Sequence, residues 1–249
     1  MNDRIFFPAG NSLALQYAAG ELTKLGLQVS DAPSKHVTHL LLDTPCKASD
    51  GQLEALLSDL PDHVQIYGGF LSRPPLKNRR CFDLLANEDY LAHNAQITAQ
   101  CAIRRAQALL PVTWNDCSVL ILGWGRIGKC LGQLLKALGA DVVIAARRPA
   151  HRAMLKALGY ESEHICFPSY ILGRYRVIFN TIPAPVLSSE NLAHCRKECI
   201  KMDLASTPGL EGEDVLIARG LPGTDAPESS GRLIVRTVLR LSAGKEDLS

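Results

Sequence analysis

The 249-residue sequence lacks several features that mark whole classes of protein. It contains no apolar run close to the roughly 20 residues that a membrane-spanning helix needs. The N-terminal segment 1–8 lacks a basic region followed by a long apolar core, so no signal peptide is predicted. The net charge is only +2, which argues against a broad nucleic-acid or membrane surface. We therefore expect a cytoplasmic protein that binds neither nucleic acid nor membrane.

A metal-binding or disulfide framework is also missing from the pattern of cysteines. There are eight cysteines but no Cys-x-x-Cys pair. The closest approach to a ligand cluster is His194 with Cys195 and Cys199, and it has no second pair to complete a site. We therefore predict reduced thiols and no metal.

The distribution of apolar residues predicts an α/β fold. Strand-type runs at 4–9 and 37–42 alternate with helix-type segments, and residues 88–110, without Gly or Pro, predict a long helix. The predicted parts are a small N-terminal α/β domain (1–87), a connecting helix (88–111), a nucleotide-binding domain (112–228), and a C-terminal helix with a tail (229–249).

A glycine-rich turn gives the sharpest functional signal. The buried strand 119–122 is followed at once by Gly123, Trp124, Gly125, Arg126, Ile127 and Gly128, and then by a helix. In this context G-x-G-x-x-G is typical of a dinucleotide site, with the pyrophosphate at the helix N-terminus. The sequence predicts a Rossmann-type doubly wound parallel sheet with the smaller N-terminal α/β domain beside it. A purely structural glycine turn is the alternative interpretation.

Two arginines follow the next strand, where NAD-specific sites usually place a carboxylate for the ribose hydroxyls. Arg147 and Arg148 stand there instead, with Arg152 nearby and no acidic residue until well downstream. Guanidinium groups attract a 2′-phosphate, so we predict NADP as the cofactor, with NAD possible. Three solvated arginines are the alternative.

Small, polar or Pro/Gly-rich segments follow three later strands, at the sheet edge where ligands bind. The candidate cofactor residues in these segments are Asn180, Thr181, Ile182, Pro183, Asp203, Ala205, Ser206, Leu221, Pro222 and Gly223. Ordinary turns have a similar composition, but three in succession favour a nicotinamide pocket.

Candidate substrate and catalytic residues are weaker. The cations Arg73, Lys77, Arg79 and Arg80 form a basic cluster that would suit an anionic substrate, or that is simply a solvated loop. His93 is an acid–base candidate at the start of the long helix, although an exposed helix histidine without chemistry is the simpler interpretation. The residues themselves identify no complete catalytic set.

Several motifs follow one another in an order that resembles a known family. They are Gly123–Gly128, Ala145–Arg147, Asn180–Pro183, Asp203–Gly209, and Gly220–Gly223 followed by Ala226 and Pro227. Together they closely resemble the A subunits of dipicolinate synthase from spore-forming bacteria, over residues 88–241. Asn94 and Thr98 match the family pattern and become candidate substrate residues.

The resemblance implies an oxidoreductase that works during sporulation. Its reaction would oxidise a dihydro- or tetrahydrodipicolinate intermediate to dipicolinate, with hydride transfer to NAD(P). A flavoprotein-like second subunit is implied as partner. Other interpretations remain open: another NADP-dependent dehydrogenase of the shikimate or 2-hydroxyacid type, or a non-catalytic NADP-binding subunit. A homo-oligomer is also possible.

Overall fold

The computed structural model describes residues 4–244, so the tail of the predicted C-terminal segment (245–249) lies outside the described residues. The chain divides into two compact units. One comprises Met1–Asn94 together with Pro222–Ser249, and the other comprises Ala95–Leu221. None of the helices in the described part combines the length and apolar character that a membrane span requires.

The N-terminal unit is built on a five-stranded sheet with the order β2-β1-β3-β4-β5. All neighbouring strands are parallel. The strands are β1 (Ile5–Ala9), β2 (Gln28–Val29), β3 (His39–Leu42), β4 (Gln65–Gly68) and β5 (Arg80–Asp83). The predictions for the segments 4–9 and 37–42 agree with β1 and β3. The segment with Arg80 was interpreted as a loop, and this is wrong, because Arg80 pairs with Gln65 in the sheet.

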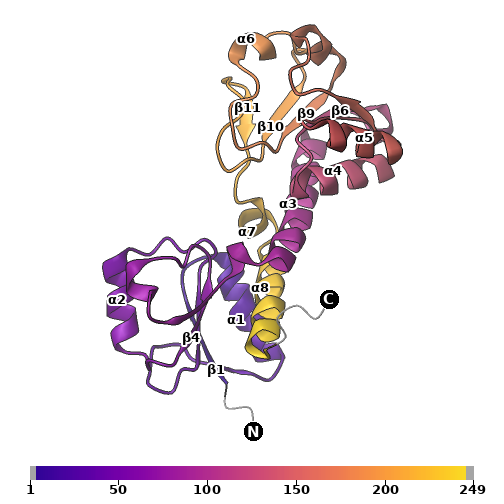
Figure 1. The fold of residues 1–249 in the computed structure, drawn as a ribbon. Helices are drawn as coiled ribbons and strands as arrows, with labels where there is room; N and C mark the ends of the chain where they lie inside the picture. Colours follow the sequence, from indigo (N-terminus) through magenta and orange to yellow (C-terminus); the bar gives the residue numbers. More distant parts are fainter. Residues whose placement is uncertain (1–3, 245–249) are drawn as a thin grey trace. The chain divides into compact units, whose positions relative to one another are not determined.

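Helices cover both faces of this sheet. On one face α2 (Asp50–Ser58) buries Leu53 and Leu57 against strand residues such as Leu40. On the other face lie α1 (Leu13–Lys24) and α8 (Pro227–Ser242), side by side (Figure 1). They approach so closely that a Cβ at Gly231 would lie 2.7 Å from the carbonyl oxygen of Ala14. The unit also contains the short 3-10 turns η1 (Pro74–Leu76) and η2 (Leu84–Ala86).

The long helix predicted for 88–110 is confirmed as α3 (Glu88–Leu109). The division between the two units falls within it, after Asn94.

The second unit is built on a six-stranded parallel sheet with the order β11-β10-β9-β6-β7-β8. Its strands are β6 (Ser118–Leu122), β7 (Asp141–Ala145), β8 (Glu161–Glu163), β9 (Val177–Asn180), β10 (Ile200–Asp203) and β11 (Val215–Ile217). Numbered along the chain, this is the 3-2-1-4-5-6 order of a Rossmann fold. The predicted fold class, two parallel α/β sheets of which one is of Rossmann type, is confirmed.

The helices of this unit place the strand ends for function. They are α4 (Arg126–Ala137), α5 (Pro149–Ala157) and α6 (Ser189–Leu192), with the 3-10 turns η3 (Trp114–Asp116) and η4 (Ser169–Arg174). A core of Leu120, Val143 and Ile178 packs against Leu172 and Leu192 from η4 and α6. Helix α4 starts immediately after the glycine turn and packs on β6 and β7.

The C-terminal segment differs from the prediction in one respect. Residues 221–223 were expected as a loop after a strand of the nucleotide-binding domain, but they form the short helix α7 (Leu221–Asp225). From Pro222 onward the chain belongs to the N-terminal unit. The physical reason is the apolar stripe of α8, with Ile234 and Val238 buried, which the N-terminal unit covers.

Candidate functional site

The glycine turn between β6 and α4 needs glycine for different reasons at different positions. Gly123 has a φ of +105°, and a Cβ there would lie 2.5 Å from Thr181 Oγ1. A Cβ on Gly128 would lie 2.3 Å from the carbonyl oxygen of Gly123. Both positions are therefore dictated by contacts within the protein itself.

Gly125 is different, because a Cβ there would meet no protein atom within 4 Å. Gly125 is the N-cap of α4, it supplies no side-chain acceptor, and the first turn of α4 carries no acidic residue. Open space above an uncapped helix N-terminus suits an anion, because the amide groups and the helix dipole both favour negative charge. The position fits the pyrophosphate role that the fingerprint predicts.

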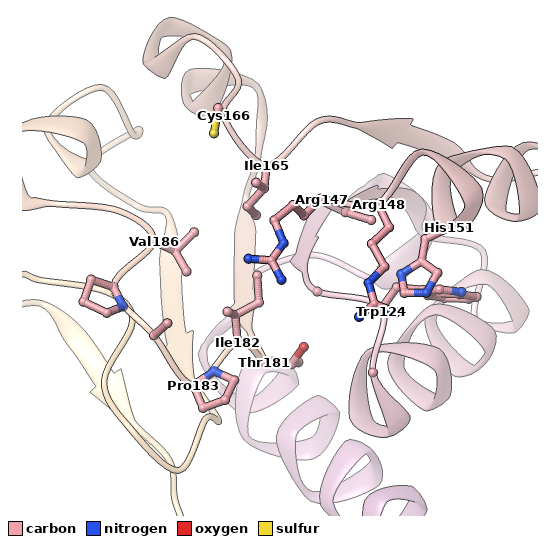
Figure 2. Close-up of a pocket in the computed structure, with 15 residues that line it drawn as sticks. Trp124, Arg147, Arg148, His151, Ile165, Cys166, Thr181, Ile182, Pro183 and Val186 are labelled. Atoms are coloured by element: carbon pink, nitrogen blue, oxygen red, sulfur yellow. The ribbon is translucent and has the colours of Figure 1, made fainter.

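A pocket of about 730 Å³ opens beside this turn (Figure 2). Three segments of the chain line it: the glycine turn, the end of β7 with the start of α5, and the loops after β8 and β9. The lining residues are Gly123, Trp124, Gly125, Ala146, Arg147, Arg148, His151, Ile165, Cys166, Thr181, Ile182, Pro183, Ala184, Pro185 and Val186. Eight of the predicted cofactor residues are thus brought together, and none of these described lining residues is acidic.

Arg147 and Arg148 are both exposed in this pocket. Neither has a carboxylate partner among residues 4–244. Arg152 is placed differently: its Nη1 donates to the carbonyl oxygens of Ala146 (2.9 Å) and Arg147 (2.8 Å). Arg152 does not line the pocket, and it fixes the backbone of the turn that carries the other two arginines.

Asn180 and Asp203 are fully buried and form a structural network behind the pocket. Asn180 Nδ2 donates to Asp203 Oδ1 (3.1 Å), and Asn180 Oδ1 accepts from the amide of Ile182 (3.0 Å). Asp203 Oδ2 also accepts from the amides of Gly209 (2.7 Å) and Leu210 (3.0 Å). These two side chains hold the loops after β9 and β10 in place and do not reach the pocket.

Comparison with known proteins places this geometry in a family context. No protein-family model matches the chain. One of the A subunits of dipicolinate synthase, from Bacillus subtilis (strain 168), is 25% identical over 241 residues, covering 86% of this chain and 81% of that protein. Another, from Bacillus halodurans, has a crystal structure that matches with a TM-score of 0.81 and 25% identity, covering 97% of this chain and 98% of that one.

The resemblance to the A subunits of dipicolinate synthase is confirmed. It was expected for residues 88–241, and the structural match extends it to nearly the whole chain. A D-isomer-specific 2-hydroxyacid dehydrogenase from Lactobacillus delbrueckii ssp. bulgaricus shares the fold, with a TM-score of 0.52, 11% identity and 99% of each chain covered.

The remaining predicted cofactor residues lie outside the described pocket. Arg126 and Ile127 form the start of α4, and Ala205 is buried with its carbonyl oxygen accepting from Arg219. Ser206 is exposed in the loop after β10. Leu221, Pro222 and Gly223 belong to α7, and none of them is a lining residue.

The four basic candidates for substrate binding do not form one cluster. Arg73 pairs with Asp50 and donates to the carbonyl oxygen of Ala48, at the start of α2. Arg79 pairs with Asp62 (3.1 Å) and with the carbonyl oxygen of Pro61, beyond the other end of α2. Because α2 separates these partners, Arg73 and Arg79 lie at opposite edges of the parallel sheet.

The other two cations have different surroundings. Lys77 is exposed after η1. The Arg80 guanidinium lies 5.4 Å from the centre of the Phe82 ring, a cation–π arrangement.

His93, Asn94 and Thr98 lie along α3. The Nδ1 atom of His93 lies 2.8 Å from the carbonyl oxygen of Asp89 and 3.2 Å from its carboxylate. Asp89 also pairs with Arg240 of α8 (3.0 Å). Thr98 is buried and Asn94 is half-buried. His93 is thus held within its own helix turn.

Several pocket residues were missed by sequence reasoning. His151 lies three residues after Arg148, a spacing that places both on one side of the first turn of α5. This spacing could have identified it. Ile165 and Cys166 follow β8, whose sequence Glu-Ser-Glu has no strand character, so nothing marked the loop behind it.

Trp124 lines the pocket and packs edge-to-face on Tyr160, with ring centres 5.8 Å apart. Burial raises the pKa of Tyr160, so its hydroxyl stays protonated at neutral pH. The other tryptophan, Trp114, is buried away from the pocket lining. Trp124 is therefore a natural fluorescent reporter of ligand binding.

The cysteine cluster noted in the sequence forms a pair of interacting thiols. The hydrogen bond with Cys199 lowers the pKa of Cys195, and the same bond with burial raises the pKa of Cys199. Among residues 4–244, no three His, Cys, Asp or Glu side chains are grouped so that they could hold a metal.

Proposed function

We propose that this chain is the nicotinamide-binding subunit of an NADP-dependent dehydrogenase similar to dipicolinate synthase. One observation supports this best: an uncapped helix start at Gly125 and the arginines Arg147 and Arg148 open into a single pocket whose described lining has no carboxylate. Helix N-termini and guanidinium groups both favour phosphate.

The residues present fit a dinucleotide. Gly125 leaves room for a pyrophosphate beside the amides of α4. Ile182, Pro183 and Val186 supply an apolar wall in the same pocket. The Lactobacillus 2-hydroxyacid dehydrogenase with this fold was solved in complex with NAD. The preference for NADP over NAD rests on the two arginines standing where NAD sites carry an acid.

Similarity to the dipicolinate synthase relative from Bacillus subtilis suggests the substrate class: a dihydro- or tetrahydrodipicolinate-type dicarboxylate. A bound nicotinamide would accept the hydride. The chain's own residues then have to hold the cofactor and neutralise two carboxylates. Lys77 and Arg80 are the better candidates for the second task, because Arg73 and Arg79 already pair with Asp50 and Asp62.

We further propose that the chain works in the cytoplasm, during sporulation, with a second, flavoprotein-like subunit. The Bacillus subtilis relative is named as one lettered subunit of its enzyme, which supports the existence of a partner. His93 remains a candidate acid or base, and Asn94 and Thr98 remain candidate substrate residues.

The test begins with binding. Titration of the protein with NADPH and NADH, followed by Trp124 fluorescence, is expected to show tighter binding of NADPH. Turnover of dihydrodipicolinate with NADP, with and without a co-expressed second subunit, is then followed by the absorbance of the pyridine product. NADPH binding without any pyridine product would contradict the dehydrogenase and favour a non-catalytic cofactor-binding subunit.

A further inference from the structure

The two neighbouring arginines of the pocket point in different directions. Figure 2 shows the Arg147 guanidinium directed toward Ile165, Ile182 and Val186. Arg148 extends instead toward His151, on the other side of the pocket. The two side chains therefore face different chemical surroundings, although they are adjacent in sequence.

The backbone explains this divergence. Arg148 is the N-cap of α5 and is extended, with φ −78° and ψ 128°. Successive side chains on an extended backbone point to opposite sides. Arg152 reinforces the arrangement, because its Nη1 donates to the carbonyl oxygens of Ala146 and Arg147 and so fixes the turn.

The surroundings of Arg147 suit a flat aromatic ring. Ile165 after β8 and Ile182 and Val186 after β9 are apolar lining residues. A planar guanidinium stacks on aromatic faces, and apolar side chains cover the opposite face of such a ring. A phosphate dianion on this side would lose hydration next to three aliphatic side chains, which is costly.

The surroundings of Arg148 suit a phosphate. His151, one turn into α5, lies on the same side of the helix as Arg148. The first turn of α5 has no side-chain cap and no acidic residue. A guanidinium, an imidazole and free helix amides all donate hydrogen bonds to a phosphate.

We propose that Arg147 stacks on the adenine ring and supports binding of both NADP and NAD, whereas Arg148 and His151 recognise the 2′-phosphate and set the preference for NADP. This inference rests on the proposed function, and it assigns separate tasks to two arginines that the sequence alone treats as one group.

The test measures the dissociation constants of NADPH, NADH, 2′,5′-ADP and 5′-AMP for the full chain and for R147A, R148A and H151A. We expect R148A to weaken NADPH and 2′,5′-ADP about tenfold, the range of a lost charge-assisted hydrogen bond, and to leave NADH and 5′-AMP within about twofold. H151A is expected to weaken the same two ligands about threefold. R147A is expected to weaken all four ligands by a similar factor, about fivefold, the range of a lost stacking contact.

R236A is the matched control, because Arg236 is exposed on α8 and does not line the pocket. It is expected to leave all four constants unchanged. Circular dichroism checks that each variant is folded.

Two results would overturn the division of tasks: a loss confined to NADPH and 2′,5′-ADP in R147A, or equal losses for all four ligands in R148A. Failure of the proposed function is seen separately, in the unaltered chain. Binding of NADH in preference to NADPH would refute the phosphate site, and binding of neither would refute the dinucleotide site itself.

Discussion

The two sheets meet the same structural situation and resolve it in opposite ways. In each, a strand leads through a glycine-containing turn into a helix, beside a neighbouring strand where the strand order reverses. In the N-terminal unit the Asp43 carboxylate, after β3, accepts from the amides of Asn11 (3.1 Å) and Ser12 (3.2 Å). In the second unit the corresponding helix start at Gly125 has no side-chain cap and faces open space.

This difference shows why only one of two similar βα turns is a candidate anion site. A Cβ at Gly10 would lie 2.6 Å from the Asp43 side chain, so the space above the first turn is already filled by a carboxylate. The protein thus supplies its own anion in the N-terminal unit. In the second unit the helix amides stay available for a ligand.

The largest effect is expected from removing the carboxylate that supports the second sheet. Asp203 is fully buried and accepts from Asn180 and from the amides of Ala205, Gly209 and Leu210. D203A leaves several buried donors without partners and is expected to lower the free energy of unfolding of this unit by at least about 3 kcal/mol. Urea denaturation with hydrogen exchange of the loop after β10 measures the loss. Unchanged exchange would contradict the supporting role.

The second effect separates the units by pH. Burial, together with the charges of Arg4 and Arg80, lowers the pKa of His39 in the N-terminal sheet to about 4. The unfolded chain then binds a proton that the folded chain rejects, so stability is complete above pH 6.5 and falls as the pH drops toward 4, by about 3 kcal/mol in total. Hydrogen exchange of β3 amides between pH 7 and pH 4.5 measures this. In H39N the pH-dependent part should disappear, and its persistence would refute the assignment.

The third effect closes the open helix start. G125A adds a methyl group where no protein atom lies within 4 Å, so the fold should keep its melting temperature. Because the methyl would occupy the space expected for the pyrophosphate, NADPH affinity should fall at least about tenfold, or about 1.4 kcal/mol. G128A is the contrasting variant, since its methyl would meet the carbonyl oxygen of Gly123 and destabilise the turn itself. Unchanged NADPH affinity in G125A would place the pyrophosphate elsewhere.

The smallest effect concerns the filled helix start. D43A removes two hydrogen bonds to the amides before α1, while Ser12 still caps that helix through Leu15 (3.2 Å). We expect a loss of about 1–2 kcal/mol, localised to α1 in hydrogen exchange, with NADPH affinity unchanged. A change in NADPH affinity that matches the loss of stability would show that the two units do not act separately in binding.

The elements that the sequence predicted well are those with strong local patterns. The run 119–122, the glycine turn after it and the Gly-free stretch of α3 each carry enough information in consecutive residues. β4 and β5 were not predicted because Gly68-Gly69 and the basic residues 77–80 have the local composition of loops. Their strand character comes from pairing with β3 and with each other.

The candidate site shows the same limit. The sequence identified Arg147 and Arg148, but not His151, Ile165 or Cys166, which reach the pocket from elements whose placement depends on the sheet. It also grouped Arg73 with Arg79, although partners near opposite ends of α2 hold them apart. Asn180 and Asp203 were predicted to contact the cofactor, and the structure buries both behind the pocket.

By itself, the sequence determined the Rossmann-type sheet, the glycine turn and the arginines after β7, because each is specified by residues adjacent in the chain. Only the tertiary structure decided which helix start stays open and which is filled by Asp43, because the carboxylate comes from a neighbouring strand about 30 residues away. It also decided where α8 packs, since an apolar helix face is satisfied by whichever surface folding brings to it.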